Sequence, residues 1–106
     1  MLAAIKKILG IGPKANFSEL LAEGAIILDV RTKGEYGGGH IRGSVNIPVE
    51  QLTSNLHKLK DKKRPIITCC ASGMRSASAK GILTSNGFVN VHNGGSWQTL
   101  NYKLGY

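Results

Sequence analysis

The sequence predicts an α/β domain, with a central parallel sheet of four to five strands and helices on both faces. Three observations support this fold class. Short, largely apolar runs have the length and composition of buried strands. Segments with helical periodicity or helix caps separate these runs, and glycines or prolines lie at the boundaries. Strands that alternate with helices form parallel sheets, because parallel neighbours need a crossover connection. The length of 106 residues suits one compact domain.

The first twelve residues, MLAAIKKILGIG, are amphipathic, with apolar side chains at helical spacing (Leu2, Ile5, Ile8 and Leu9). We expect residues 1–12 to form an extension that rests as a short helix on a domain of residues 13–106. Its uninterrupted apolar stretch is too short for a secretory signal. No run in the chain approaches the roughly 20 apolar residues that a membrane-spanning helix needs, so we expect no membrane span.

The domain is predicted to begin with a helix and a buried strand. Asn16 is a good N-cap residue, and Glu19 three positions later completes the pattern of a capping box. The helix would cover residues 17–23 and end at Gly24. The largely apolar run AIILDV then predicts a buried parallel strand over residues 25–30.

The middle of the chain predicts a loop, a short strand and a helix. Residues 32–43 are polar and rich in glycine, so we expect a loop with one helical turn near Glu35. A short strand over 45–47 is stopped by Pro48. Leucines on one face predict a helix over residues 50–59.

The last third predicts two strands and two helices. Residues 65–70 form the second clear buried strand. A helix over 75–86 ends at Gly87 and is rich in small residues, so it can lie close to a sheet. A last strand over 89–92 leads through two glycines into a final helix over 97–103.

The chain is basic, with a formal net charge of +8. Nucleic-acid binding is one interpretation of this charge. However, several basic residues cluster around the end of the predicted helix 50–59, where a solvated helix end accounts for them (Lys58, Lys60, Lys62, Lys63 and Arg64). Only six aromatic residues are present, without a stacking motif. We therefore expect no nucleic-acid partner and interpret the charge as a surface that attracts small anions.

The two cysteines, Cys69 and Cys70, are adjacent at the end of the strand 65–70. Adjacent cysteines rarely form a disulfide with each other, and two cysteines do not make a disulfide framework. The small number of cysteines and their position fit a reducing compartment or a catalytic thiol. We expect a cytoplasmic protein. The three histidines and two cysteines have no metal-ligand spacing, so we expect no metal.

Ligands of parallel sheets collect outside the carboxyl ends of the strands. The strand 25–30 ends at Asp29-Val30-Arg31 and the strand 65–70 ends at Cys70, so both groups reach the same edge. Side chains alternate along a strand, so the two thiols point to opposite sides of the sheet. We expect Cys69 to pack in the core and Cys70 to begin the turn into the next helix.

The five residues after Cys70 are small or uncharged up to Arg75: Ala71, Ser72, Gly73, Met74 and Arg75. Their backbone N–H groups can curl around one point and form an anion nest, to which the helix start adds its positive pole. Both effects lower the pKa of a thiol and favour the nucleophilic thiolate. The alternative interpretation is a buried strand cysteine followed by an ordinary turn.

The segment Cys70-Ala71-Ser72-Gly73-Met74-Arg75-Ser76 resembles the active-site loop of rhodanese domains, C-x-x-G-x-R-S. The resemblance spans about residues 16 to 100, with Trp97 closer to the preceding glycines than is usual. Other matches follow in the family's order: Asp29-Val30-Arg31, Glu35-Tyr36, Gly39-His40-Ile41, Gly43-Ser44, Asn46-Ile47-Pro48 and Gly94-Gly95 before Trp97.

This resemblance implies a sulfurtransferase without a metal or organic cofactor. Cys70 would take the outer sulfur of an anionic donor such as thiosulfate, hold it as a persulfide, and pass it to cyanide, a thiol or a protein acceptor. The N–H groups of residues 71–75 would stabilise the persulfide anion. Asp29 and Arg31 would hold the loop, and Arg75 would brace the loop or contact the donor.

Three other functions remain open from the sequence. The chain could be a sulfur-carrier or interaction module that turns over thiosulfate poorly, because the loop has no charged side chain except Arg75. It could be a phosphatase or arsenate reductase of the related fold, or it could bind nucleic acid. The sequence specifies neither the physiological donor and acceptor nor the oligomeric state.

Overall fold

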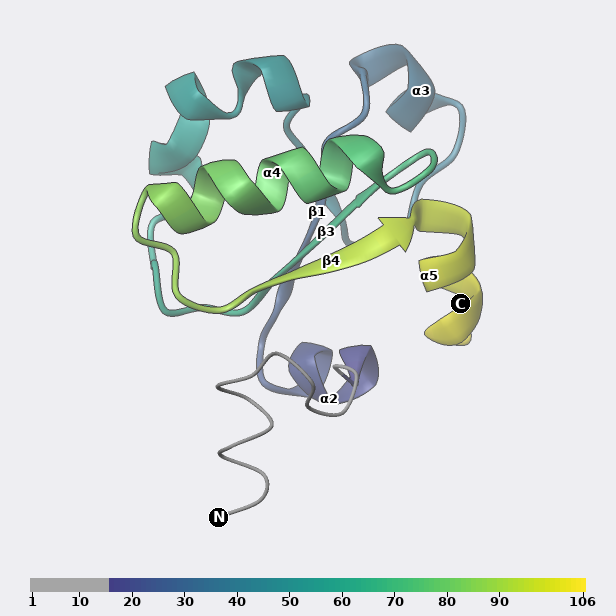
Figure 1. Cartoon of the computed structure of the whole chain (residues 1–106). Helices are drawn as coiled ribbons and strands as arrows, with labels where there is room; N and C mark the ends of the chain where they lie inside the picture. Colours follow the sequence, from purple (N-terminus) through teal and green to yellow (C-terminus); the bar gives the residue numbers. More distant parts are fainter. Residues whose placement is uncertain (1–15) are drawn as a thin grey trace.

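The computed structural model describes residues 16–106, so the predicted N-terminal extension lies outside the described residues. The elements alternate as expected (Figure 1). In chain order they are α2 (Phe17–Ala22), β1 (Ile26–Asp29), α3 (Lys33–Gly37), β2 (Val45–Asn46), the 3-10 helices η1 (Val49–Gln51) and η2 (Thr53–Leu59), β3 (Ile66–Cys70), α4 (Met74–Ser85), β4 (Val91–Ser96) and α5 (Trp97–Lys103). No helix in this described part is long and apolar enough to cross a membrane.

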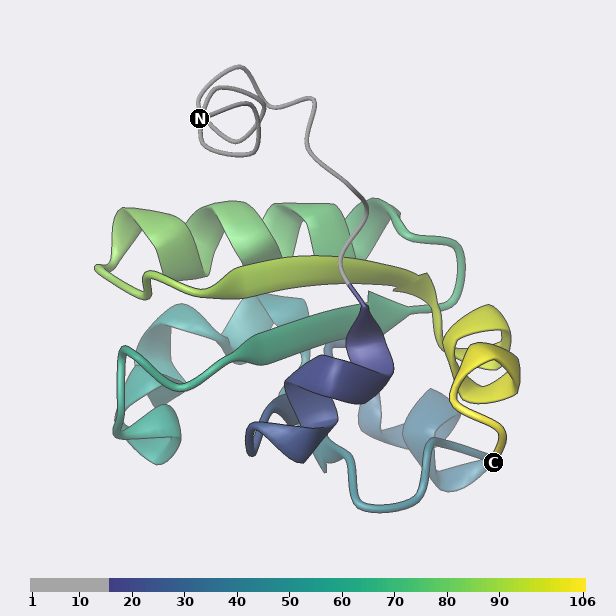
Figure 2. The ribbon, with the colours of Figure 1, turned by 90° about the horizontal axis from the view of Figure 1, so that it is seen from below.

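The four strands form one parallel sheet in the order β2-β1-β3-β4, so the predicted fold class is confirmed. The helix α4 and the two 3-10 helices lie on one face, and α2 and α5 lie on the other (Figure 1). Seen from below, α2 crosses in front of the strands (Figure 2). Because strand side chains alternate, β3 contributes to both layers.

Two apolar cores follow from this arrangement. The core on the α4 face joins strand residues to the 3-10 helices and α4, and it includes Leu28, Val30, Leu52, Leu59, Ile66, Ala79 and Leu83. The core on the α2 and α5 face contains Ile27, Ile41, Ile67 and Leu100, with half-buried side chains of α2 packed against it. Both sheet faces are therefore covered, as a parallel sheet requires.

The carboxyl ends of the strands meet at one edge. Asp29 of β1 pairs with Asn46 of β2 on one side and with Cys69 of β3 on the other. Cys70 pairs with Ser96 after a register shift in β4. The sequence motifs that end in Arg31 and Cys70 are therefore neighbours in space, as expected.

The predicted strand over 89–92 is wrong at both ends, since β4 runs from Val91 to Ser96. Val89 is exposed and its N–H bonds to the carbonyl of Lys62 in a turn. The strand continues through Gly94, whose lack of a side chain is required. A Cβ there would lie 2.8 Å from the Ile67 side chain and 2.9 Å from that of Leu100. Glycines usually weaken strands, so the pattern indicated an early end.

The single helix predicted over 50–59 is replaced by η1 and η2. The interruption lies at Asn55, which has φ −123° and donates its side-chain amide to the Gln51 carbonyl at 2.7 Å. Side-chain bonds to the backbone compete with α-helical pairing in this way.

The capping box also differs from the prediction, because Asn16 caps only the Glu19 N–H. The reciprocal box is formed by Thr32 and Glu35 in α3.

Candidate active site

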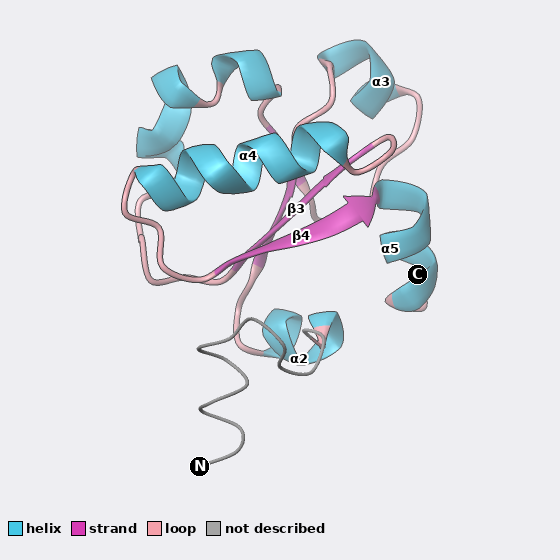
Figure 3. Cartoon of the chain, in the orientation of Figure 1, coloured by secondary structure: helices cyan, strands magenta, loops and turns pink. Residues whose placement is uncertain are grey.

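Cys70 is the last residue of β3 and points toward α4, whereas Cys69 points into the core beneath α5. The opposite orientation of the two thiols follows the prediction. Neither residue has exposed surface, and both are free thiols. The loop that follows Cys70 is the turn between β3 and α4 (Figure 3).

The sulfur of Cys70 is surrounded by polar groups of this turn. The Gly73 N–H donates to Sγ at 2.9 Å and the Ser76 N–H at 3.4 Å. The thiol in turn donates to the Ser76 hydroxyl oxygen at 3.4 Å. Gly73 is the N-cap of α4 and has φ +100°, a left-handed conformation that favours glycine. The backbone can therefore turn its N–H back onto the sulfur.

This environment separates the acidities of the two thiols. Burial by itself raises the pKa of Cys70, but hydrogen bonds from the Ser76 hydroxyl and from the Ser76, Gly73 and Ser72 N–H groups lower it below its usual value. Burial raises the pKa of Cys69 to about 12, with a further increase from the Asp29 carboxylate. Cys70 is therefore the more acidic of the two thiols, and its neighbours stabilise the thiolate form.

Arg75 lies at the start of α4 and forms a bidentate ion pair with Glu35 of α3, at 2.7 and 2.9 Å. This hydrogen-bonded pairing, with the capping bond from Thr32, lowers the pKa of Glu35 to about 2. The remaining side chains of the loop carry no charge, and Met74 is 78% exposed. Arg75 thus braces the loop against α3, and the loop offers no other cation to a ligand.

Asp29 and Arg31 form a buried ion pair, with 2.7 Å between Oδ2 and the guanidinium. The rest of the guanidinium donates to the carbonyls of Glu35 and Gly39 and lies 4.7 Å from the centre of the Trp97 ring. Neither side chain bonds to residues 71–75. The pair therefore holds the segment that carries α3, and it supports the cysteine loop only through Glu35 and Arg75.

Two residues of the site had no predicted role. Ser76 is fully buried, and its hydroxyl oxygen lies 3.4 Å from Cys70 Sγ and 2.7 Å from Asn93 Oδ1. The contact between Ser76 and Cys70 could have been predicted from the position of Ser76, one residue after Arg75. Side chains in the first turn of a helix can face the end of the strand that precedes it. Nothing in the sequence indicates Asn93, which comes from the edge strand β4.

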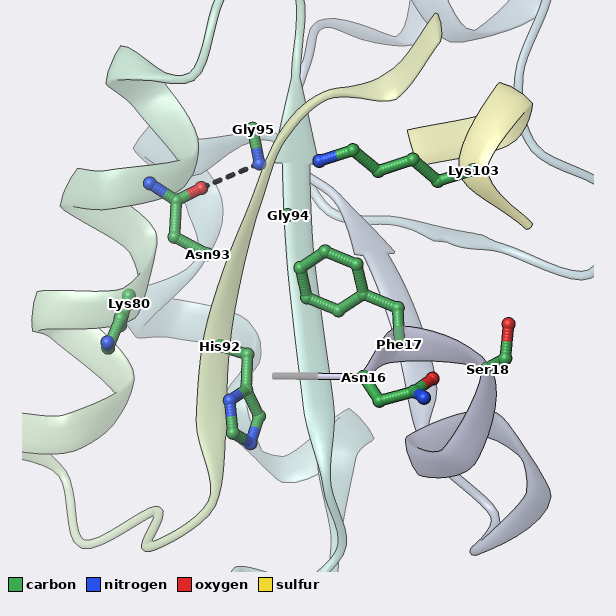
Figure 4. A pocket seen from close by; sticks show the side chains of 9 residues that line it. All are labelled: Asn16, Phe17, Ser18, Lys80, His92, Asn93, Gly94, Gly95 and Lys103. Carbon is green, nitrogen blue, oxygen red and sulfur yellow. Dashed lines mark hydrogen bonds between the residues drawn. The ribbon is translucent and has the colours of Figure 1, made fainter. Parts of the chain in front are cut away.

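A pocket of about 680 Å³ lies along the free side of β4 (Figure 4). Its lining includes Phe17, Lys80, His92, Asn93 and Lys103. The lining residues next to the site are Asn93, Gly94 and Gly95, and Cys70 does not line the pocket. Within residues 16–106 no group of three metal-binding side chains is close enough to hold a metal ion.

Comparisons with known proteins identify the family of this chain. The family model described as Rhodanese-like domain matches residues 14–98. The uncharacterized protein YqhL of Bacillus subtilis is 36% identical over 69 residues, which cover 65% of this chain. The thiosulfate sulfurtransferase PspE of Escherichia coli is 32% identical over 74 residues, 69% of this chain and 71% of PspE.

The chain spans about half the length of the curated relatives that it matches first, 54% in the case of YqhL. Among solved structures, the human single-domain sulfurtransferase TSTD1 superimposes with a TM-score of 0.70 at 28% identity, covering 81% of this chain and 88% of the human one. The family match covers most of the described residues and includes the cysteine loop. This chain belongs to the rhodanese-like domain family.

Proposed function

We propose that this protein is a sulfurtransferase that carries sulfur as a persulfide on Cys70. The observation that carries the proposal is the arrangement of donors around Sγ. The N–H groups of Gly73 and Ser76 and the Ser76 hydroxyl lower the pKa of one thiol at the carboxyl edge of the sheet. The family of the chain and its likeness to PspE support the same reaction class.

The reaction needs a donor with a sulfane sulfur, such as thiosulfate. The Cys70 thiolate attacks the outer sulfur, a new S–S bond forms, and the old S–S bond breaks as sulfite leaves with the bonding electrons. An acceptor thiolate or cyanide then attacks the terminal sulfur of the persulfide, and Cys70 leaves as a thiolate. The loop N–H groups stabilise negative charge at each stage, so no metal or organic cofactor enters the proposal. The two free thiols suit a reducing compartment such as the cytoplasm.

Because Cys70 has no exposed surface, the loop must move before a donor reaches the sulfur. Gly73 permits such a movement, since it has wide backbone freedom and lies at the centre of the turn. The loop is also one residue shorter than the C-x5-R loop of related phosphatases, with four residues between Cys70 and Arg75. A shorter loop leaves room for a sulfur atom but crowds a phosphate, so we favour sulfur over phosphate chemistry.

One observation favours a second candidate, a carrier that receives sulfur from a protein partner and uses thiosulfate poorly. Arg75 is engaged by Glu35, and no other residue of the loop is charged. A small dianion such as thiosulfate would therefore be bound in the loop by backbone N–H groups, without an unpaired cationic side chain. A persulfide delivered by a protein carries less charge and does not need one.

Intact mass spectrometry after incubation with thiosulfate tests the proposal. The wild-type chain should gain the mass of one sulfur atom, Cys70→Ser should gain none, and Cys69→Ser should still gain it. Loss of the adduct in Cys69→Ser alone would show that the assignment of the two thiols is wrong.

Two further assays separate the alternatives. Steady-state turnover with thiosulfate and cyanide distinguishes an enzyme from a carrier, which would form the persulfide but turn over slowly. Hydrolysis of an aryl phosphate should be negligible. Cys70-dependent hydrolysis faster than sulfur transfer would contradict the proposed chemistry.

A further inference from the structure

The hydroxyl of Ser76 has one proton and three neighbours that can compete for it. Its oxygen lies 2.7 Å from Asn93 Oδ1, 3.0 Å from the Gly73 carbonyl and 3.4 Å from Cys70 Sγ. The Gly73 carbonyl already accepts the N–H of Ala77 at 3.1 Å. The position of this proton therefore depends mainly on Asn93 and on the charge of Cys70.

The orientation of the Asn93 amide is fixed by its other contacts. Oδ1 accepts the N–H of Gly95 at 2.9 Å, the bond drawn in Figure 4. Nδ2 lies 3.5 Å from the Gly73 carbonyl. If the amide were reversed, its NH2 group would face the Gly95 N–H, and two donors would oppose each other. The oxygen of Asn93 therefore faces Ser76, and it can only accept the hydroxyl proton.

The two protonation states of Cys70 require different positions of that proton. When Cys70 is neutral, its S–H donates to the Ser76 oxygen and the Ser76 O–H donates to Asn93, so each group has a partner. When Cys70 is ionised, the Ser76 O–H stabilises the thiolate only by turning toward the sulfur. Two oxygen atoms, of Ser76 and Asn93, then face each other 2.7 Å apart without a proton between them.

We propose that Asn93 is a positioning residue that holds the Ser76 hydroxyl proton away from Cys70 and so sets the balance between its thiol and thiolate forms. The proposal relies on the proposed function only in taking Cys70 as the reacting thiol. Asn93 therefore raises the fraction of Cys70 in the thiol form relative to a site that lacks the Asn93 amide oxygen. Once the thiolate has formed, the hydroxyl turns to it, and Asn93 retains its bond from Gly95.

The other ionisable groups near the site do not take part in this arrangement. None of them bonds to Cys70 Sγ, the Ser76 hydroxyl or Asn93. They are Cys69 on β3, Arg75 and Lys80 on α4, Glu35 on α3, Glu50 on η1, Asp29 and Arg31 at the end of β1, and His92 on β4. Neutral substitutions at Asn93 leave all these charges in place.

The test is a titration of the Cys70 thiol in a Cys69→Ala background, followed by thiolate absorbance and by alkylation rate. Asn93→Ala should lower the midpoint. The thiolate fraction well below the midpoint should rise about fivefold, the size expected for one competing hydrogen bond. Asn93→Asp should raise the midpoint, because a carboxylate holds the Ser76 proton more strongly and adds negative charge nearby.

A second variant separates this role from a structural one. Ser76→Ala should raise the midpoint, and adding Asn93→Ala to it should produce no further shift. If Asn93→Ala acts equally with and without the Ser76 hydroxyl, it acts through the backbone and the proposal is wrong. An unchanged or raised midpoint in Asn93→Ala alone would also overturn it.

Asn90→Ala is the matched control, since Asn90 lies just before β4 and its side chain bonds to His92 at 2.7 Å. It should leave the midpoint unchanged. Asn93 has an exposed side chain, so its variants should fold, which urea unfolding verifies. The titration uses no sulfur donor, so a chain that forms no persulfide would contradict the proposed function and leave this result intact.

Discussion

Replacing Asp29 by asparagine should strongly destabilise the domain, because it leaves the Arg31 guanidinium buried without its carboxylate. The side chains of the pair are 0% and 5% exposed. Asp29 accepts the Arg31 backbone N–H and three bonds from the guanidinium, at 2.7 to 3.0 Å. Asparagine can accept at one oxygen only, and its NH2 group would face the guanidinium.

Removing one partner of a buried ion pair costs about 3–5 kcal/mol. The remaining partners of Arg31, two carbonyls and the Trp97 ring, offset part of this loss and favour the lower end. About 3 kcal/mol is a large share of the roughly 5–15 kcal/mol that stabilises a domain. With a urea m-value of about 1–3 kcal/mol/M, the unfolding midpoint should fall by about 1–3 M.

Urea unfolding followed by far-ultraviolet circular dichroism measures this change. Asp61→Asn is the matched control, since Asp61 is exposed and its Oδ1 accepts the Lys63 N–H, a bond that asparagine retains. We expect the control to shift stability by less than about 0.5 kcal/mol. A midpoint for Asp29→Asn close to that of the control would refute the reasoning.

A double variant, Asp29→Leu with Arg31→Met, tests the same reasoning when the single variant fails to fold. It removes both charges, so it should be more stable than Asp29→Asn. If the double variant is equally destabilised, the loss comes from packing and not from the unpaired guanidinium. The folded fraction of either variant should keep the wild-type titration of Cys70, because the pair does not bond to residues 71–75.

Three further predictions concern the loop and its supports. The alkylation rate of Cys70 should rise with pH around a midpoint below the roughly 8.5 of a free cysteine thiol, and a midpoint at or above that value would contradict the hydrogen-bond argument. The pKa of Glu35 is lowered from 4.5 to about 2 in the folded chain, so its pairing with Arg75 stabilises the domain above pH 4.5 and loses this effect as the pH falls through about 2. The difference in urea midpoint between wild type and Glu35→Gln should therefore be present at pH 6 and absent below pH 2; a difference that persists there would have another origin. Gly94→Ala should lower stability by about 1–3 kcal/mol, because its Cβ would lie 2.8–2.9 Å from atoms of β3 and α5. Gly34→Ala, where nothing lies within 4 Å of the added Cβ, should be neutral or stabilising, and equal effects at the two glycines would show that crowding is not the cause.

The sequence determined the order of the elements, the parallel sheet and the opposite orientation of the two cysteines. These features follow from local patterns, since burial of a strand and alternation of its side chains are visible over a few residues. The nest of N–H groups predicted over residues 71–75 is formed only in part, because Gly73 donates to Sγ and the second N–H donor is Ser76, outside that segment. A short turn before a helix allows few backbone conformations. Gly73 permits the one that this turn adopts, with φ +100°.

Only the tertiary structure decided which side chains brace the site. Arg75 meets a glutamate 40 positions away, and Ser76 meets an asparagine 17 positions away on the edge strand. The extension of β4 through Gly94 was decided in the same way, by the closeness of β3 and α5. Contacts of this kind arise when separate strands and helices pack together, and no local pattern records which polar groups the packing will bring within hydrogen-bond distance.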